Sequence, residues 1–143
     1  MPERFKLIPE VHLFMIKEGK ILLLLRENTG YEDGKYSVVA GHLDGNESIT
    51  AAMVREAWEE AGLIIHPDNL KFVHVMHRKS DQERLSFFFV PEIWEGEPIN
   101  MEPDKCGELN WYPLQSLPEN MIPYVKLALQ HYLNNIFYSE FNW

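Results

Sequence analysis

Short apolar runs, separated by polar and glycine-containing segments, predict several β-strands along the chain. Val11–Ile16 and Ile21–Arg26 are expected to form a hairpin whose turn lies at 17–20. Two later apolar runs, separated by a polar segment, predict a longer antiparallel pair. The expected strands cover residues 11–16, 21–26, 36–40, 70–76, 84–90 and 109–113.

Two segments have apolar residues at the spacing of an α-helix. The first covers Ser48–Ala61, after which Gly62 provides a C-terminal stop, and the second covers Tyr124–Phe137. Loops are expected at Asn28–Lys35, Gly41–Glu47 and Trp94–Gly107. Strands and helices are mixed without a regular repeat, which predicts an α/β or α+β fold whose sheet faces are covered by helices.

Length and composition favour one soluble, acidic domain. A chain of 143 residues corresponds to a single domain, 1–143, at roughly 150 residues per domain. The formal net charge of −9 argues against binding to nucleic acid or to an anionic membrane. The longest aliphatic run, Ile21–Leu25, is far shorter than a membrane span, and the first residues lack a secretion signal. The only cysteine, Cys106, excludes an intramolecular disulfide, so we expect a cytoplasmic protein.

The helix expected at 48–61 carries a group of acidic side chains. On a helical wheel, Glu56, Glu59 and Glu60 fall within an arc of about 100°. The apolar residues expected to pack on a sheet fall on the opposite side and are Val54, Ala57, Trp58 and Ala61. Like charges at this spacing destabilise a helix by about 0.2–0.5 kcal/mol per pair. A hard divalent cation bound by the carboxylates would offset this repulsion, and the carbonyl of Gly41 could be a further ligand of that cation. For three glutamates alone, a solvated acidic helix face is the alternative.

A longer sequence pattern surrounds these glutamates. From Gly41 to Leu63 it reads Gly-x5-Glu-x7-Arg-Glu-x-x-Glu-Glu-x-Gly followed by an aliphatic residue. This stretch resembles the Nudix box and matches it at every fixed position, although Ala57 is smaller than the aliphatic residue often found at its place. The resemblance implies a Nudix-type α/β/α sandwich with a mixed β-sheet between helices. It also implies Mg²⁺-dependent hydrolysis of a nucleoside diphosphate linked to another group, with Mn²⁺ as a substitute for Mg²⁺.

The same resemblance implies roles for the charged residues of the box. Glu56, Glu59 and Glu60 are expected to hold the metal ions. Arg55 is expected to orient these carboxylates through charge-assisted hydrogen bonds, with Glu47 as its partner. One carboxylate must act as the general base, and the family does not use one fixed position for it.

A further acidic ligand is expected from a loop after the box. Trp94–Pro98 resembles a strand-end sequence of the MutT-type nucleoside triphosphate pyrophosphohydrolases in this family. Read on without a gap, Glu102 falls at their late metal-binding glutamate, and Glu108 is the second choice. An ordinary exposed loop acid is the alternative for Glu102. The catalytic candidates are therefore Arg55, Glu56, Glu59 and Glu102.

Two absences narrow the substrate class that the resemblance implies. The ADP-ribose branch of the family tends to carry a proline after the box, and this chain has none between Pro67 and Pro91. The dinucleotide-polyphosphate branch tends to carry a tyrosine there, and none occurs between Tyr36 and Tyr112. Both absences favour hydrolysis of a nucleoside triphosphate, including an oxidised one such as 8-oxo-dGTP, to NMP and pyrophosphate. The alternatives are another nucleoside diphosphate derivative, such as a nucleotide sugar or ADP-ribose, and a nucleotide sensor without turnover.

Two residues outside the box are candidates for substrate binding. Arg26, at the end of an expected strand, could reach phosphates or the base, or could form a strand-end salt bridge. Asn120 lies in a segment, 117–123, that resembles the base-reading segment of the MutT-type enzymes. Its amide can donate and accept at once and so can read a purine edge, whereas capping of the final helix is the alternative.

The remaining features carry weaker expectations. Arg78, Lys79 and Arg84 flank the expected hairpin turn, where solvated side chains are the favoured interpretation. A phosphate contact of His42 is the less favoured interpretation of that residue. The aromatic segment 137–143 could dock on the body or form a homodimer contact. The expected partner is therefore a small nucleotide, without nucleic acid or membrane, and a second copy of the chain is a further candidate.

Overall fold

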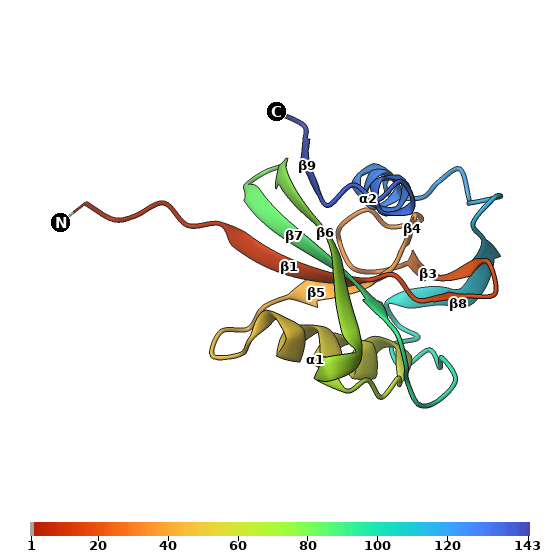
Figure 1. Cartoon of the computed structure of the whole chain (residues 1–143). Helices are drawn as coiled ribbons and strands as arrows, with labels where there is room; N and C mark the ends of the chain where they lie inside the picture. Colours follow the sequence, from red (N-terminus) through yellow and green to blue (C-terminus); the bar gives the residue numbers. More distant parts are fainter. Residues whose placement is uncertain (1) are drawn as a thin grey trace.

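The computed structural model describes residues 2–143, which form nine strands, two α-helices and one 3₁₀ turn (Figure 1). The strands are β1 Ile8–Leu13, β2 Ile16–Lys17, β3 Lys20–Arg26, β4 Tyr36–Ser37, β5 Val39–His42, β6 Leu70–Lys79, β7 Glu83–Pro91, β8 Cys106–Pro113 and β9 Tyr138–Phe141. The helices are α1 Ile49–Ala61 and α2 Pro123–Leu133, and the 3₁₀ turn is η1 Pro67–Asn69.

The strands form two sheets. A five-stranded sheet has the order β5-β1-β7-β6-β9, and a four-stranded sheet has the order β2-β3-β4 with β8 also paired to β3. The five-stranded sheet is mixed, because β1 pairs with β7 and β6 with β9 in parallel, whereas β1–β5 and β6–β7 are antiparallel. The expected antiparallel pair of β6 and β7 is confirmed, and both strands are longer than the sequence indicates.

The first expected strand is divided between the two sheets, so the hairpin expected from Val11 to Arg26 is only partly correct. The Phe14 amide donates to the carbonyl of Phe89 at 2.8 Å in the five-stranded sheet, whereas the Met15 carbonyl accepts from Leu22 at 2.9 Å beside β3. The chain therefore changes sheets between these two residues. Only the short β2 pairs with β3, while β1 pairs with β5 and β7.

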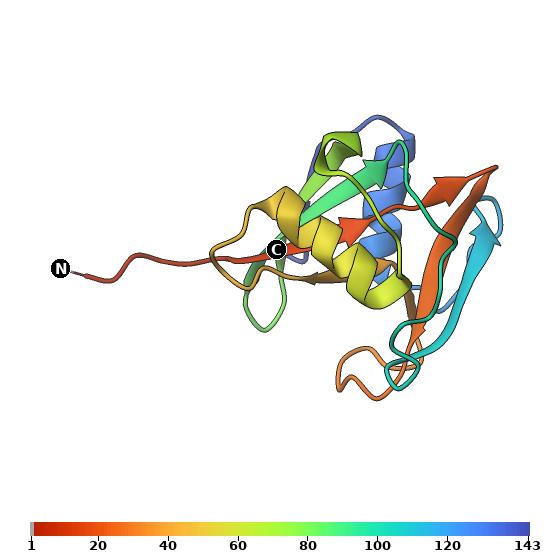
Figure 2. The same ribbon diagram turned by 90° about the horizontal axis from the view of Figure 1, so that it is seen from below.

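The two helices cover opposite faces of the five-stranded sheet. Figure 2 shows α1 in front of the strands and α2 behind them. One core cluster contains Met53 and Ala57 of α1, and the other contains Val125 and Leu129 of α2. This arrangement confirms the α/β/α sandwich with a mixed sheet between helices.

Helix α1 has the expected ends but not the expected apolar face. The Ser48 hydroxyl accepts from the amide of Ala51 at 3.1 Å, and Gly62 ends the helix with a φ of 65°. Trp58, which was expected to pack on a sheet, is 51% exposed. The buried residues of α1 are Ala52, Met53, Ala57 and Ala61. The packed face is therefore rotated away from Trp58 and towards the side that carries Glu56 and Glu60.

The C-terminal segment docks on the body as an additional strand. α2 ends at Leu133, before the expected boundary, and Asn135 turns the chain with a φ of 59°. β9 then runs parallel to β6 and pairs with residues 75–78 (Figure 1). The sequence does not predict this strand, although docking on the body is one of its two alternatives for the aromatic segment.

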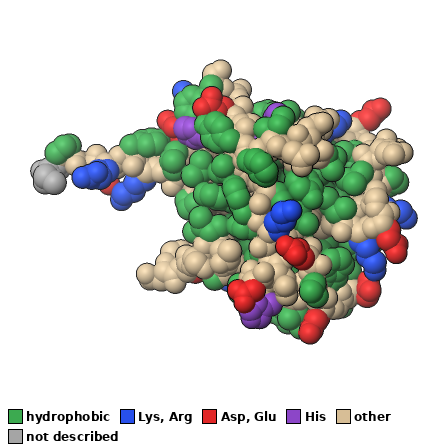
Figure 3. Space-filling view, viewed as in Figure 1, with side chains coloured by type: hydrophobic (Ala, Val, Ile, Leu, Met, Phe, Trp, Pro, Cys, Tyr) green, Lys and Arg blue, Asp and Glu red, His purple; other side chains and the backbone are tan. Residues whose placement is uncertain are grey.

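No helix within residues 2–143 has the length and apolar character that crossing a membrane requires. Figure 3 shows the N-terminal segment extending from the body and apolar side chains gathered over the centre of the viewed face. Residues 2–7 are exposed, so this segment contributes little to the core.

Candidate active site

A cavity of about 600 Å³ is lined by residues of both sheets, both helices and the loops after β3 and before β8. This volume lies within the usual range for small-molecule sites. Two charged groups of residues line it. The carboxylate cluster consists of Glu56, Glu59, Glu60 and Glu102, and the arginine cluster consists of Glu10, His12, Arg78, Arg84 and Tyr124.

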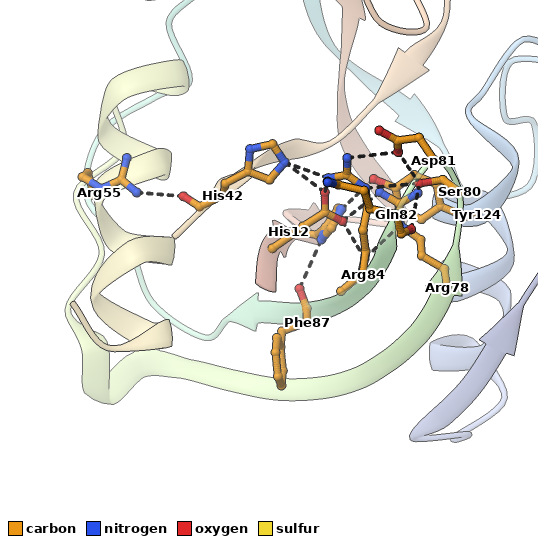
Figure 4. Close-up of polar contacts among 12 residues, drawn as sticks. His12, His42, Arg55, Arg78, Ser80, Asp81, Gln82, Arg84, Phe87 and Tyr124 are labelled. Carbon is orange, nitrogen blue, oxygen red and sulfur yellow. Dashed lines mark hydrogen bonds and ion pairs between the residues drawn. The ribbon is translucent and has the colours of Figure 1, made fainter. Parts of the chain in front are cut away.

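Arg55 organises the side of the cavity that α1 forms. Its Nη1 donates to Glu56 Oε1 at 2.7 Å and to Glu59 Oε2 at 3.2 Å. Its Nε and Nη2 donate to the two carboxylate oxygens of Glu47 at 3.1 and 2.8 Å. Nη2 also donates to the carbonyl of His42 at 3.1 Å, a contact that Figure 4 shows. Arg55 therefore joins α1 to the loop before it and to β5.

Burial disfavours the negative charge of Glu60 and of Glu56. Desolvation raises the pKa of Glu60 to about 8, and the charges of Glu56 and Glu102 add to the effect, although the Ala40 amide donates to Oε1 of Glu60 at 2.8 Å. Desolvation also raises the pKa of Glu56, against the contrary influence of Arg55. The folded protein therefore disfavours the ionised form of both glutamates.

Gly41 allows Glu56 to approach the backbone of β5. A Cβ atom at Gly41 would lie 2.2 Å from Cδ and 2.3 Å from Oε1 of Glu56. Any larger residue would therefore displace this carboxylate. The glycine at the start of the box is thus required by the close packing of α1 on β5.

The structure separates the two candidate acids of the late loop. Glu102 lines the cavity, and its carbonyl accepts from the amides of Lys105 and Cys106 at 2.9 Å, so the loop turns tightly there. Glu108 is not among the cavity residues and accepts hydrogen bonds from Tyr36, at 3.0 Å, and from Tyr112. Glu102 therefore lies with the box glutamates, and Glu108 lies apart from them.

Arg26 lines the cavity at the end of β3. Its Nε donates to the carbonyl of Tyr31 at 2.8 Å, and its Nη2 donates to the Thr29 hydroxyl at 3.1 Å. Within residues 2–143 it forms no salt bridge, so the alternative of a strand-end ion pair is wrong. The loop after β3 holds this guanidinium by these two hydrogen bonds and by the ring of Tyr31, whose centroid lies 5.5 Å from Cζ of Arg26.

Asn120 lies outside the set of cavity residues. Its side-chain amide donates to the carbonyl of Gly34 at 2.9 Å and so holds the loop that follows β3. The N-cap of α2 is Ile122, and no side chain caps that helix. The helix-cap alternative for Asn120 is therefore wrong.

Sequence reasoning missed the arginine cluster, because it favoured a solvated turn for Arg78 and Arg84. That interpretation is wrong, since their side chains are 5% and 15% exposed. β6 and β7 extend to Lys79 and Glu83, so both arginines belong to the sheet and contact Glu10 of β1. The available signal was Glu10 itself, a charged residue within an apolar run.

Glu10 joins the members of the arginine cluster. Its Oε1 accepts from Arg78 Nη2 and from the Ser86 hydroxyl, both at 2.8 Å, and its Oε2 accepts from Arg84 Nη1 at 3.0 Å. The His42 ring lies 3.2 Å from the same Oε2. Figure 4 shows His42 between Arg55 and Arg84, with its carbonyl towards Arg55 and its ring towards Arg84.

His12 and Tyr124 form the inner end of the arginine cluster. Burial lowers the pKa of His12 to about 4, so the ring is neutral at pH 7. Its Nδ1 lies 3.3 Å from the carbonyl of Phe87, and its Nε2 lies 2.8 Å from the hydroxyl of Tyr124. The neutral ring therefore donates from Nδ1 to the carbonyl and accepts at Nε2 from the hydroxyl.

The ionisation of Glu10 makes the stability of the fold depend on pH. Burial alone raises the pKa of Glu10, but the charge that His12 gains below its own pKa of about 4, the charge of Arg78 and hydrogen bonds from Arg78 and Ser86 outweigh it and hold the pKa of Glu10 at about 2. The stabilisation is therefore complete above the usual value of 4.5 and is lost as the pH falls towards 2.

We expect Glu10→Gln to lower the free energy of unfolding by about 1–3 kcal/mol at pH 7, because Arg78 and Arg84 lose their counter-charge. The difference from the parent protein should shrink below pH 4.5. Denaturant titrations at pH 7, 4 and 3 measure this. A difference that stays constant over this range would contradict the role of Glu10 as a buried counter-ion.

Comparison with known proteins decides the family. The model of the NUDIX domain matches residues 6–132, which include the whole box and both charged clusters. The chain belongs to the NUDIX family. The resemblance that the segment from Gly41 to Leu63 carries is thereby confirmed.

Several solved NUDIX structures share the fold. The MutT NUDIX hydrolase from Burkholderia pseudomallei has a TM-score of 0.80 at 23% identity, over 88% of this chain and 98% of that one. A NUDIX hydrolase from Nitrosomonas europaea has a TM-score of 0.77 at 17% identity, over 98% of this chain and 81% of that one. At these identities, the likeness establishes the fold alone.

Curated relatives of this NUDIX chain include NAD-capped RNA hydrolases named NudC. The protein from Escherichia coli (strain SMS-3-5 / SECEC) is 31% identical over 96 residues, which are 67% of this chain and 36% of the relative. The protein from Shigella dysenteriae serotype 1 is 28% identical over 101 residues, which are 71% of this chain and 38% of the relative. The chain thus spans little more than a third of the length of these relatives.

The NUDIX box residues fit a divalent cation by their chemistry. In the orientations that the structure gives them, no three His, Cys, Asp or Glu side chains of residues 2–143 converge to hold a metal ion, and Arg55 binds Glu56 and Glu59 instead. The donors are nevertheless carboxylate oxygens, which Mg²⁺ and Mn²⁺ prefer. Burial raises the pKa of Glu56 and Glu60, neighbouring carboxylates add to this increase, and a cation among them would offset the repulsion.

Proposed function

We propose that this NUDIX protein hydrolyses a phosphoanhydride bond of a nucleoside diphosphate derivative, with Mg²⁺ as cofactor and Mn²⁺ as a substitute. The observation that carries the proposal is that the carboxylate cluster and Arg26 line one cavity of nucleotide size. Family membership and the hydrolases among the relatives and structural neighbours support a hydrolytic reaction.

In this proposal the carboxylate cluster, together with the carbonyl of Gly41, holds the metal ion. Bound Mg²⁺ would neutralise charge on the phosphate oxygens and lower the pKa of the attacking water. Arg55 keeps Glu56 and Glu59 in orientation, and Glu47 keeps Arg55 in place.

The chain's own residues then carry the proton and bind the substrate. A water oxygen bonds to one phosphorus while the bridging P–O bond breaks, and the leaving phosphate keeps the bridging oxygen. Glu56, Glu59 or Glu102 accepts the proton of the water as the general base. Arg26 binds the substrate through its guanidinium, and Asn120 contributes by holding the loop that carries Arg26's partners.

We propose a nucleoside triphosphate, canonical or oxidised, as the substrate, hydrolysed to NMP and pyrophosphate. The MutT-like segment 94–98 and the cavity position of Glu102 support this choice. A second candidate is a dinucleotide such as NAD, because the curated relatives are named as NAD-capped RNA hydrolases. Both substrates contain a nucleoside diphosphate linked to another group.

A substrate panel with Mg²⁺ and Mn²⁺ tests the proposed function. It contains canonical and oxidised nucleoside triphosphates, NAD, ADP-ribose and nucleotide sugars, and chromatography of the products identifies the broken bond. We expect NMP and pyrophosphate from at least one triphosphate. Turnover of NAD alone would favour the second candidate. Nucleotide binding without turnover of any compound would instead indicate a sensor and overturn the proposal.

Glu102→Gln tests the contribution of the late loop. We expect kcat to fall by about 10- to 100-fold with a much smaller change in KM, because the carboxylate acts on the reaction rather than on initial binding. Glu108→Gln is the matched control, since Glu108 lies outside the cavity lining, and should change kcat less. Steady-state kinetics on the preferred substrate measure both variants. The reverse ranking would show that Glu108 is the functional acid.

A further inference from the structure

We propose that the arginine cluster binds a phosphate group of the substrate that the carboxylate cluster does not hold. Arg78 and Arg84 are the binding residues, and Glu10 is a positioning residue that acts through them. This inference rests on the proposed function, because both clusters line the same cavity. It goes further because it assigns a ligand, a phosphate group, to cavity residues that are not part of the NUDIX box.

The first argument is the free donor of Arg78. Its Nε donates to the Ser86 hydroxyl at 3.1 Å and its Nη2 to Glu10 at 2.8 Å, whereas Nη1 has no hydrogen-bond partner within residues 2–143. No buried side-chain nitrogen or oxygen in that range lacks a partner, so Nη1 must keep accessible surface. Because the side chain is 5% exposed and lines the cavity, that surface faces the cavity.

The second argument is the charge of the cluster. Two guanidinium groups face one carboxylate, and His12 is neutral at pH 7, so these groups carry a net positive charge. Asp81 contacts Arg84 at 3.3 Å but is exposed, and an exposed ion pair contributes little. The cluster therefore attracts an anion to its part of the cavity lining, which the carboxylate cluster does not form.

The third argument is the lack of free acceptors. Both oxygens of Glu10 already accept hydrogen bonds, and the ring nitrogens of His12 are occupied by Phe87 and Tyr124. A nucleobase edge usually presents donors as well as acceptors, and its donors would find few partners here. A phosphate presents only acceptors at neutral pH, and guanidinium forks match its geometry.

The arginines are also held in place before any ligand binds. Arg78 lies over the ring of Tyr124 at 3.7 Å from its centroid, and Arg84 is bound by Glu10 and Ser80 (Figure 4). Fixed donors lose little conformational entropy on binding, which favours affinity and selectivity. Glu10 provides this rigidity because it contacts both guanidinium groups.

Two parts of a nucleotide could supply the phosphate. It could be the distal phosphate of the anhydride chain, or a phosphate on the ribose. Isothermal titration calorimetry with Mg²⁺ separates these sources by comparing 5′-AMP with ADP, 2′,5′-ADP and 3′,5′-ADP, and the corresponding guanosine compounds. We expect at least one of the compounds with two phosphates to bind about tenfold more tightly than the corresponding monophosphate. A gain in affinity of this size corresponds to one additional charge-assisted hydrogen bond. A gain in affinity with ADP alone shows that the bound group is the distal phosphate of the anhydride. A gain with 2′,5′-ADP or 3′,5′-ADP shows that it is a phosphate on the ribose.

Three variants connect this gain to the cluster. Arg84→Gln should reduce the bisphosphate-to-monophosphate ratio of affinities to near one. The paired variant Arg78→Gln with Glu10→Gln removes one buried guanidinium together with the carboxylate that it binds, leaves Arg84 its contact with Asp81, and should have the same effect. Lys71→Gln makes the same change of charge on an exposed part of β6 and should leave the ratio unchanged. Circular dichroism checks the fold, and if the paired variant fails to fold, Arg84→Gln alone decides.

The inference is overturned if no bisphosphate gains affinity over its monophosphate, or if the gain persists in Arg84→Gln and in a folded paired variant. A ratio that moves in these variants cannot come from a merely structural role, which would weaken all ligands alike. The titration requires no turnover. An inactive protein that shows the gain would thus overturn the proposed function alone, and an active protein without the gain would overturn this inference alone.

Discussion

Glu60→Gln is expected to lower kcat on the preferred nucleotide by about 100- to 1000-fold. The substitution keeps the size of the side chain and an oxygen that can accept from the Ala40 amide, as Glu60 does at 2.8 Å. It removes the negative charge that we propose for metal binding. Steady-state kinetics at saturating Mg²⁺ measure the effect, and turnover near that of the parent protein would contradict the assignment of Glu60.

Thermal melting separates this effect from a loss of structure. Desolvation raises the pKa of Glu60 to about 8, so its carboxylate is unfavourable in the folded protein without a cation. The variant should therefore melt in EDTA at or above the temperature of the parent protein. Mg²⁺ should raise the melting temperature of the parent protein more than that of the variant, because only the parent keeps the full set of ligands.

Gly41→Ala is expected to lower kcat by about 100-fold, because a displacement of about 1 Å at a reacting group has effects of this size. The new Cβ would lie 2.2 Å from Cδ of Glu56 and would force the carboxylate to move. The carboxylate is the far end of a flexible side chain, so the cost in stability should stay within about 1–3 kcal/mol. Kinetics and denaturant titrations of the variant measure the two effects.

Gly107→Ala is the matched control for this experiment. A Cβ at Gly107 would lie 2.2 Å from Oε1 of Glu27, which is the same kind of crowding, but neither residue lines the cavity. The control should lose a similar amount of stability and keep its kcat. If both variants lose activity to the same degree, then the effect of Gly41→Ala reflects general destabilisation rather than the position of Glu56.

The sequence predicts the acidic side of the site well because its contacts are local. Arg55 reaches Glu47 over eight positions and Glu59 over four, and both distances follow from a helix and its capping loop. The spacing of these residues therefore contains nearly all the information about their geometry. The position of Glu102 could not be predicted from spacing within the helix. Only the resemblance of the segment 94–98 to a known loop connected this residue with α1.

The arginine side could not be predicted in the same way. Glu10 and Arg78 are 68 positions apart, and Glu10 and Ser86 are 76 apart, so their contact depends on the pairing and register of β1, β6 and β7. A shift of one residue in register would reverse the faces of these side chains. The change of sheets at Phe14 was hidden for a related reason, because an apolar run looks the same in either sheet.

The short β9 bears on how the protein resists aggregation. β6 is the longest strand of the described chain, and without β9 its outer edge would expose unpaired backbone groups at residues 75–78, beside the apolar Val75 and Met76. Such an edge is a template on which the strand of another molecule can pair. β9 replaces it with an edge of only four residues. Truncation before Tyr138 would therefore be expected to yield a protein that associates edge to edge, even though the cavity residues all precede the cut.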